Sequence, residues 1–123
     1  MVIGCPHCSI SELRQIAAHL DGKKISNSVE LWVLTSHAVR AMAQRMGLTD
    51  VIEKAGGKII VDTCPDVITR RTLENLGHRI ITTNATVFAH SIGEYSAPHY
   101  FDNHIHYGRL KKCLDSAVSG AWR

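Results

Sequence analysis

The sequence predicts an α/β fold: a three-layer α/β/α domain with Rossmann-like βα repeats and a mostly parallel sheet of about four strands. Short apolar runs alternate with amphipathic stretches along the chain, and the runs over 29–35 and 58–62 are nearly continuous, as strands buried on both faces require. The chain has 123 residues, enough to bury one core, and it shows no linker or internal repeat. A single domain over residues 1–123 is therefore expected.

The first element expected is a strand that ends at Val2-Ile3 and looks cut short. Ser9 is followed three residues later by Glu12, which predicts a capping box at the start of a helix that runs to about Leu20. This places Cys5 to Cys8 in a strand-to-helix turn, against the helix N-terminus.

The next elements are a strand over 29–35 and a helix that Ser36 caps and Gly47 ends. Met42 and Met46 stand at helical spacing, so they are expected on the buried stripe of that helix. Thr49 is expected to cap a short helix. The remaining elements are expected as a strand over 58–62, a helix over 67–76, a strand over 79–82, a brief helical run over 85–90, an irregular stretch over 91–107 and a last helix over 110–121.

Composition limits the possible partners and compartments. The net charge of +3 comes from 14 basic and 11 acidic residues, and the basic pairs are isolated from one another, so no nucleic-acid partner is expected. No apolar run approaches the roughly 18 residues of a membrane span, and no signal-peptide core follows Met1, so a cytoplasmic protein without a membrane partner is expected. In that compartment four cysteines indicate metal or redox chemistry.

Polar and thiol side chains follow the expected strands. In a parallel sheet the turns after the strands open on one edge, so a single crevice is expected to receive four of them: Gly4-Cys5-Pro6-His7, Thr35-Ser36-His37, Thr63-Cys64-Pro65 and Thr83-Asn84. Nearby helix N-termini add partial positive charge, which lowers the pKa of a thiol and favours the thiolate that binds metal. Cys5 and Cys64 are alike, because each precedes a proline at the same topological position.

A second interpretation rests on Cys5-Pro6-His7-Cys8 alone. A C-x-x-C motif before a helix is typical of thioredoxin-like proteins, in which the helix N-terminus activates the attacking thiol. A thiol-disulfide oxidoreductase is therefore an alternative function.

Four motifs in this order resemble the aconitase X family of iron–sulfur hydro-lyases. They are Gly4-Cys5-Pro6-His7, Asp62-Thr63-Cys64-Pro65, Thr83-Asn84 and Leu110-Lys111-Lys112-Cys113. The resemblance covers essentially the whole chain and corresponds to the C-terminal third of the family's large subunit. It implies a dehydratase that removes water from a small hydroxy acid, with the exposed iron of a cluster as Lewis acid.

The resemblance also implies roles for individual residues. The cofactor would be an iron–sulfur cluster with Cys5, Cys64 and Cys113 as ligands. The catalytic residues would be His7, Ser9 and Asn84, and the substrate-binding residues would be Thr35, Ser36 and Thr83.

The same resemblance implies partners. They are the remaining domains of the large subunit, a small swivelling subunit and a small-molecule substrate, so the chain is hypothesised to be a fragment that is inactive alone. Where the family usually continues with a serine and then a lysine, this chain has Ala85 and Val87. That difference favours a third alternative, a non-catalytic α/β module that binds a metal, a small molecule or a partner subunit.

Overall fold

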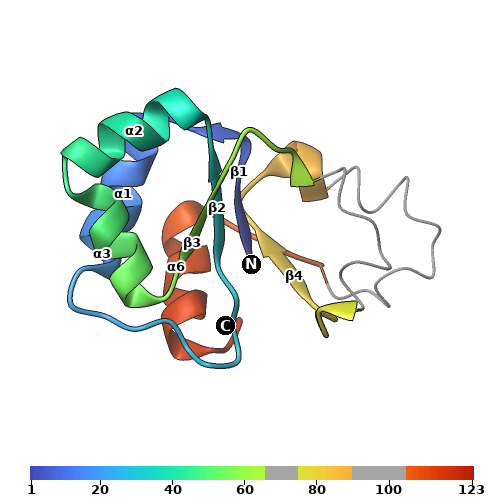
Figure 1. Cartoon of the computed structure of the whole chain (residues 1–123). Helices are drawn as coiled ribbons and strands as arrows, with labels where there is room; N and C mark the ends of the chain where they lie inside the picture. Colours follow the sequence, from blue (N-terminus) through green and yellow to red (C-terminus); the bar gives the residue numbers. More distant parts are fainter. Residues whose placement is uncertain (66–74, 90–104) are drawn as a thin grey trace.

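The computed structural model describes residues 1–65, 75–89 and 105–123, and these form a parallel sheet with helices packed on it (Figure 1). The strand order is β3-β2-β1-β4-β5, and every neighbouring pair is parallel. The strands are β1 (Val2–Cys8), β2 (Trp32–Thr35), β3 (Lys58–Val61), β4 (Ile81–Thr83) and β5 (Ile105–Tyr107), and the helices are α1 (Ile10–Leu20), α2 (His37–Arg45), α3 (Leu48–Ala55) and α6 (Leu110–Ser119).

Each face of the sheet has its own hydrophobic core. Ile3 and Val33 belong to the larger cluster, which takes in buried residues of α1, α2, α3 and α6. Val2, Leu34 and Phe88 belong to the smaller cluster on the opposite face. In Figure 1 helices α1, α2 and α3 lie on one side of the sheet, and the helical turn over 86–89 lies on the other. Successive side chains along β1 and β2 thus point alternately into the two cores.

The α/β class and the parallel sheet are confirmed, with five strands among the described residues instead of about four. The additional strand is β5, which lies in a stretch expected to be irregular and pairs in register with β4. Residues 66–74, which include most of the expected helix over 67–76, lie outside the described residues, and so do residues 90–104. No helix in the described part of the chain is long and apolar enough to cross a membrane.

The central strand β1 departs most from expectation, because extended backbone continues through Cys8 and the turn predicted over Cys5 to Cys8 is wrong. Ile3 pairs with Val33 and Cys8 with Thr35, so β1 advances five residues (3 to 8) while β2 advances two (33 to 35). This bulge is possible because residue 4 is glycine: its φ is +106°, and a Cβ there would overlap the carbonyl oxygen of Leu34.

The helix starts follow the expected caps in two cases. Ser9 forms the complete capping box with Glu12, and the Ser36 hydroxyl accepts a hydrogen bond from the backbone N–H of Val39. The third case is wrong: α3 begins at Leu48 after Gly47, which has a left-handed backbone and provides no side-chain cap. Thr49 therefore lies inside α3, where its side chain is buried.

Three further expectations need correction. Met42 and Met46 are 51% and 43% exposed, so they do not lie on the buried stripe of α2; its buried residue is Ala43. A small residue at that position lets α2 lie close to α1 and α3, and the methionines turn outward. The strand over 58–62 is an edge strand with half-buried side chains, and the strand over 29–35 begins only at Trp32.

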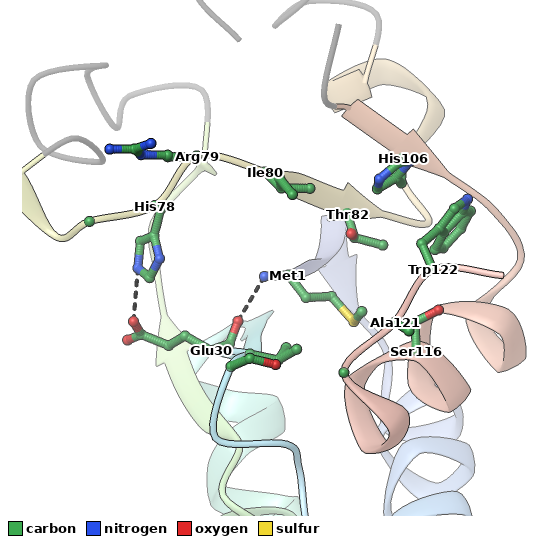
Figure 2. A pocket seen from close by; sticks show the side chains of 14 residues that line it. Met1, Glu30, His78, Arg79, Ile80, Thr82, His106, Ser116, Ala121 and Trp122 are labelled. Atoms are coloured by element: carbon green, nitrogen blue, oxygen red, sulfur yellow. Dashed lines mark hydrogen bonds and ion pairs between the residues drawn. The ribbon is translucent and has the colours of Figure 1, made fainter. Parts of the chain in front are cut away.

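Glu30 joins several elements at the edge of the sheet where the strands begin. Its carboxylate pairs with Lys58, accepts a hydrogen bond from the Trp32 indole at 2.9 Å and lies 2.8 Å from the ring of His78 (Figure 2). The hydrogen bond from Lys58, followed by that from Trp32, lowers the pKa of Glu30 to about 2. Glu30 thereby ties the loop before β2 to β3 and to the segment before β4.

We expect Gly4→Ala to destabilise the fold more than Gly22→Ala. Both glycines have positive φ, but a Cβ at Gly22 meets nothing within 4 Å. The control therefore loses only the strain of about 1 kcal/mol, whereas Gly4→Ala adds the overlap with Leu34 and loses about 3 kcal/mol. Urea unfolding measures both, and equal losses in the two variants would contradict the close approach of β1 to β2.

We expect Glu30→Gln to change how stability depends on pH. Because the pKa of Glu30 in the folded chain lies below its ordinary value of 4.5, its stabilisation is present above pH 4.5 and is lost as the pH falls towards 2. Since the carboxylate is partly exposed, the variant should lose about 1–2 kcal/mol at neutral pH. Thermal melts from pH 7 to pH 2 should show a flatter profile for Glu30→Gln and the wild-type profile for Glu53→Gln, a carboxylate on the surface of α3.

Candidate active site

The ends of β1 and β3 are joined by one side chain. Nε2 of His7 lies 2.6 Å from the carbonyl oxygen of Thr63. Because a carbonyl oxygen only accepts, Nε2 must carry the proton, and in the neutral ring Nδ1 is then the acceptor nitrogen. The ring of His7 is exposed at the carboxyl edge of the sheet. The contact fixes the tautomer of His7 and holds the two strand ends together.

Two cysteines that form no disulfide lie at this edge. Cys5 and Cys64 are both half-buried. Cys5 packs against the smaller core cluster, which contains Ala85 and Phe88, and Pro65 lines a small cavity together with Phe88. In Figure 1 the chain that leaves β3 crosses towards the helical turn over 86–89. Cys5 thus packs beside the segment that follows β4, and the contact of His7 with Thr63 joins the ends of β1 and β3.

Asn84 lies in the turn after β4, and its side-chain oxygen, Oδ1, is buried without a hydrogen-bond partner in the part of the chain that the structure describes. A buried amide oxygen without a partner costs about 1–3 kcal/mol, which a bound hydroxyl or N–H group would recover. The neighbouring Thr83 is fully buried, and its hydroxyl accepts from the N–H of Ala85 at 3.1 Å.

The other predicted hydroxyls are already engaged. The Ser9 hydroxyl takes part in the capping box of α1, and Ser36 caps α2. Thr35 is fully buried and donates to the carbonyl oxygen of Cys8 at 2.7 Å. These three residues hold the helix starts and the bulged end of β1 in place, so their geometry supports a positioning role.

Asp62 lies at this edge and belongs to the motif Asp62-Thr63-Cys64-Pro65, but no role was predicted for it. It directly follows β3, has a φ of +55°, and its Oδ1 accepts from the backbone N–H of His37 at 2.9 Å. The carboxylate therefore caps α2 from outside that helix. The available signal was an acidic residue immediately after a strand.

Cys8 and Cys113 lie away from this edge. Both belong to the larger core cluster on the other face of the sheet. Burial raises the pKa of Cys8 to about 12 and that of Cys113 to about 11, and the Cys113 thiol lies 3.5 Å from the carbonyl oxygen of Gly108. Cys5 and Cys8 thus face different cores, which argues against a redox pair.

The thiols at the carboxyl edge fit part of a metal or cluster site. Half-buried cysteines are accessible enough to act as thiolate ligands. Among residues 1–65, 75–89 and 105–123, no group of three or more His, Cys, Asp or Glu side chains is placed to hold a metal ion. The described residues therefore supply two candidate ligands, Cys5 and Cys64, and not a complete set.

The chain is an α/β domain with a parallel sheet, and the carboxyl edge of such a sheet is the usual place for ligands. The family model of the aconitase X third domain matches residues 1–119. The chain belongs to the aconitase X family.

Relatives of the chain carry two enzyme names. The phosphomevalonate dehydratase large subunit of Methanocaldococcus jannaschii is 47% identical over 83 residues, which cover 68% of this chain and 19% of the relative. The phosphomevalonate dehydratase large subunit of Methanosarcina mazei is 33% identical over 124 residues, which cover 100% of this chain and 28% of the relative. The cis-3-hydroxy-L-proline dehydratase of Hypocrea jecorina is 30% identical over 118 residues, which cover 96% of this chain and 19% of the relative.

A solved structure has the same fold. The crystal structure of Thermococcus kodakaraensis aconitase X in its holo-form superposes with a TM-score of 0.78 at 30% identity, covering 94% of this chain and 28% of that chain. The chain thus spans between 19% and 28% of the length of these relatives.

We expect the four cysteines to fall into two reactivity classes. With a pKa of about 12, the thiolate fraction of Cys8 at pH 8 is about one in ten thousand, and Cys113 is similarly protected by burial. Iodoacetamide labelling followed by peptide mass spectrometry should modify Cys5 and Cys64 in the folded chain, and all four cysteines in urea. Rapid labelling of Cys8 in the folded chain would revive the redox interpretation.

Proposed function

We propose that this chain supplies the third domain of an aconitase X-type hydro-lyase that removes water from a small hydroxy acid. The observation that supports the proposal is the contact between His7 and the carbonyl of Thr63, which joins the chain segments that carry Cys5 and Cys64, in a chain that the family model matches. The names of the relatives support a dehydration reaction on a phosphorylated hydroxy acid or a hydroxylated imino acid.

The proposed cofactor is an iron–sulfur cluster, held on this chain by Cys5 and Cys64. When bound, its exposed iron supplies a Lewis acid for the substrate hydroxyl. Cys113 was predicted as a third ligand, but its burial in α6 supports a packing role instead. The remaining ligands would come from outside the described residues.

The proposed roles of the other residues follow from their contacts. Asn84 Oδ1 accepts a hydrogen bond from the substrate, since the described residues leave it unpaired. His7 holds a proton on Nε2 against Thr63 and presents Nδ1 as an acceptor, so it can take up or pass on a proton at that atom. Ser9, Thr35, Ser36 and Thr83 position these groups.

The proposed partners are the rest of a large subunit and a small subunit. The relatives are named large subunits, and this chain spans at most 28% of their length. A site with two candidate ligands on this chain needs further protein around it to exclude water. The chain is therefore proposed to be inactive alone.

The site can be tested by anaerobic reconstitution with iron and sulfide in excess dithiothreitol, which supplies thiolates for open iron positions. We expect visible sulfur-to-iron charge-transfer absorption in the wild type. This absorption should be lost in Cys5→Ser and Cys64→Ser and retained in Cys113→Ser, whose thiol lies in the other core. A folded wild type without the absorption, or a Cys5→Ser variant that keeps it, would refute the assignment.

A non-catalytic module remains the second candidate, because Val87 is 62% exposed where the family usually has a lysine. A chimera in which this chain replaces the matching segment of the Methanosarcina mazei large subunit separates the two candidates. Phosphomevalonate dehydration by the chimera favours the enzyme. Activity that appears only after Ala85→Ser and Val87→Lys favours the non-catalytic module.

A further inference from the structure

A second cavity lies at the opposite edge of the sheet, where the strands begin. Its volume is about 290 Å³, at the lower end of the range for small-molecule sites. Figure 2 shows Met1, Thr82, His106, Ser116 and Trp122 around it. Strands β4 and β5 provide one wall, and the C-terminal half of α6 with the residues that follow it provides another.

The cavity is separate from the candidate active site. Thr82 and His106 are partners in the register between β4 and β5, so their side chains share one face of the sheet. Ile81, next to Thr82, belongs to the core on the other face, where Cys5 also packs. The wall formed by Thr82 and His106 therefore lies on the opposite face of the sheet from Cys5, at the edge where the strands begin.

Two hydroxyls in the wall of the cavity have no use within the described structure. Thr82 and Ser116 are only 9% and 7% exposed, and neither side chain has a hydrogen-bond partner among the described residues. Both hydroxyls are therefore able to donate, and a ligand that accepts hydrogen bonds could be held by both.

A third donor is held rigidly beside them. The ring of His106 stacks on Trp122, with centroids 5.2 Å apart and planes 11° from parallel. Nζ of Lys112 lies 4.4 Å from the centroid of the Trp122 ring. Trp122 also packs against Gly108, where a Cβ would lie 2.6 Å from the indole. The imidazole of His106 is thus fixed at the wall of the cavity.

The charge around the cavity favours an anion. Its carboxylate, Glu30, is already shared by Lys58, Trp32 and His78. Arg79 lies at the rim, where its side chain extends outward and has no ion-pair partner among the described residues (Figure 2). Arg79 contributes positive potential at the entrance and no contact inside.

We propose that this cavity binds a small oxyanion, a carboxylate or a phosphate, which accepts hydrogen bonds from Thr82 Oγ1, Ser116 Oγ and a ring nitrogen of His106. The site requires no cluster and no substrate of the hydro-lyase, so it stands or falls independently of the proposed function.

The test is a titration of the whole 123-residue chain, followed by ¹⁵N–¹H NMR, with inorganic phosphate and with succinate. Sodium chloride at equal ionic strength is the reference. We expect saturable shifts of the Trp122 indole and of the Thr82, His106 and Ser116 amides with at least one of the two anions. The one that binds more tightly identifies the class. Non-saturable shifts, or the same shifts with sodium chloride, would overturn the proposal.

Two variants remove the hydroxyls with little change of shape. Thr82→Val combined with Ser116→Ala should weaken binding at least about tenfold, since hydrogen bonds to a charged ligand are lost. Ser116→Ala alone should weaken it about threefold or more and tests the site if the double variant does not fold. Ser11→Ala, on the exposed face of α1, should bind as the wild type does. Unchanged affinity in folded Ser116→Ala and in the double variant would contradict the site.

Discussion

The close approach of β1 to β2 at Gly4 is the constraint on which the candidate active site depends. β1 is the central strand, and a side chain at residue 4 would meet the Leu34 carbonyl and, at 3.0 Å, the Cys8 sulfur. Because glycine removes that obstacle, β1 bulges and carries Cys5 to His7 out of the regular ladder. Strict alternation from Ile3 would place Cys5 on the face of the larger core and Cys8 on the opposite face, and the bulge reverses both placements.

Backbone and side-chain hydrogen bonds then fix the bulged segment to its neighbours. The Thr35 hydroxyl holds the carbonyl of Cys8, His7 meets the carbonyl of Thr63, and Asp62 closes the start of α2. Most polar groups at this edge therefore serve the architecture. Beside them lie two half-buried thiols, one imidazole nitrogen and the amide oxygen of Asn84, which has no hydrogen-bond partner among the described residues. Such a small set of groups is consistent with a domain that contributes one wall of a larger site.

Local signals in the sequence predicted the class of fold, the caps at Ser9 and Ser36 and the meeting of the turns around Cys5 and Cys64. They failed where long-range packing decides. Gly4 and Pro6 indicated a turn, yet the chain continues as a bulged strand that pairs with β2 again at Cys8. β5 has only three residues and depends on β4, and helical spacing could not tell which face of α2 is buried, so Met42 and Met46 were misplaced. The hydrogen bond of Thr35 to the carbonyl of Cys8 could not be predicted either, because only the fold brings these two residues together.

The most direct test of the central claim is whether Cys5 and Cys64 bind one metal ion together. Cadmium(II) reports this through its thiolate charge-transfer absorption, whose intensity scales with the number of thiolate ligands. The account predicts one cadmium per chain with two thiolates, a loss of about half the absorption in Cys5→Ser and in Cys64→Ser, and no loss in Cys113→Ser. Absorption that is unchanged in Cys5→Ser and Cys64→Ser, or that disappears in Cys113→Ser, would contradict it.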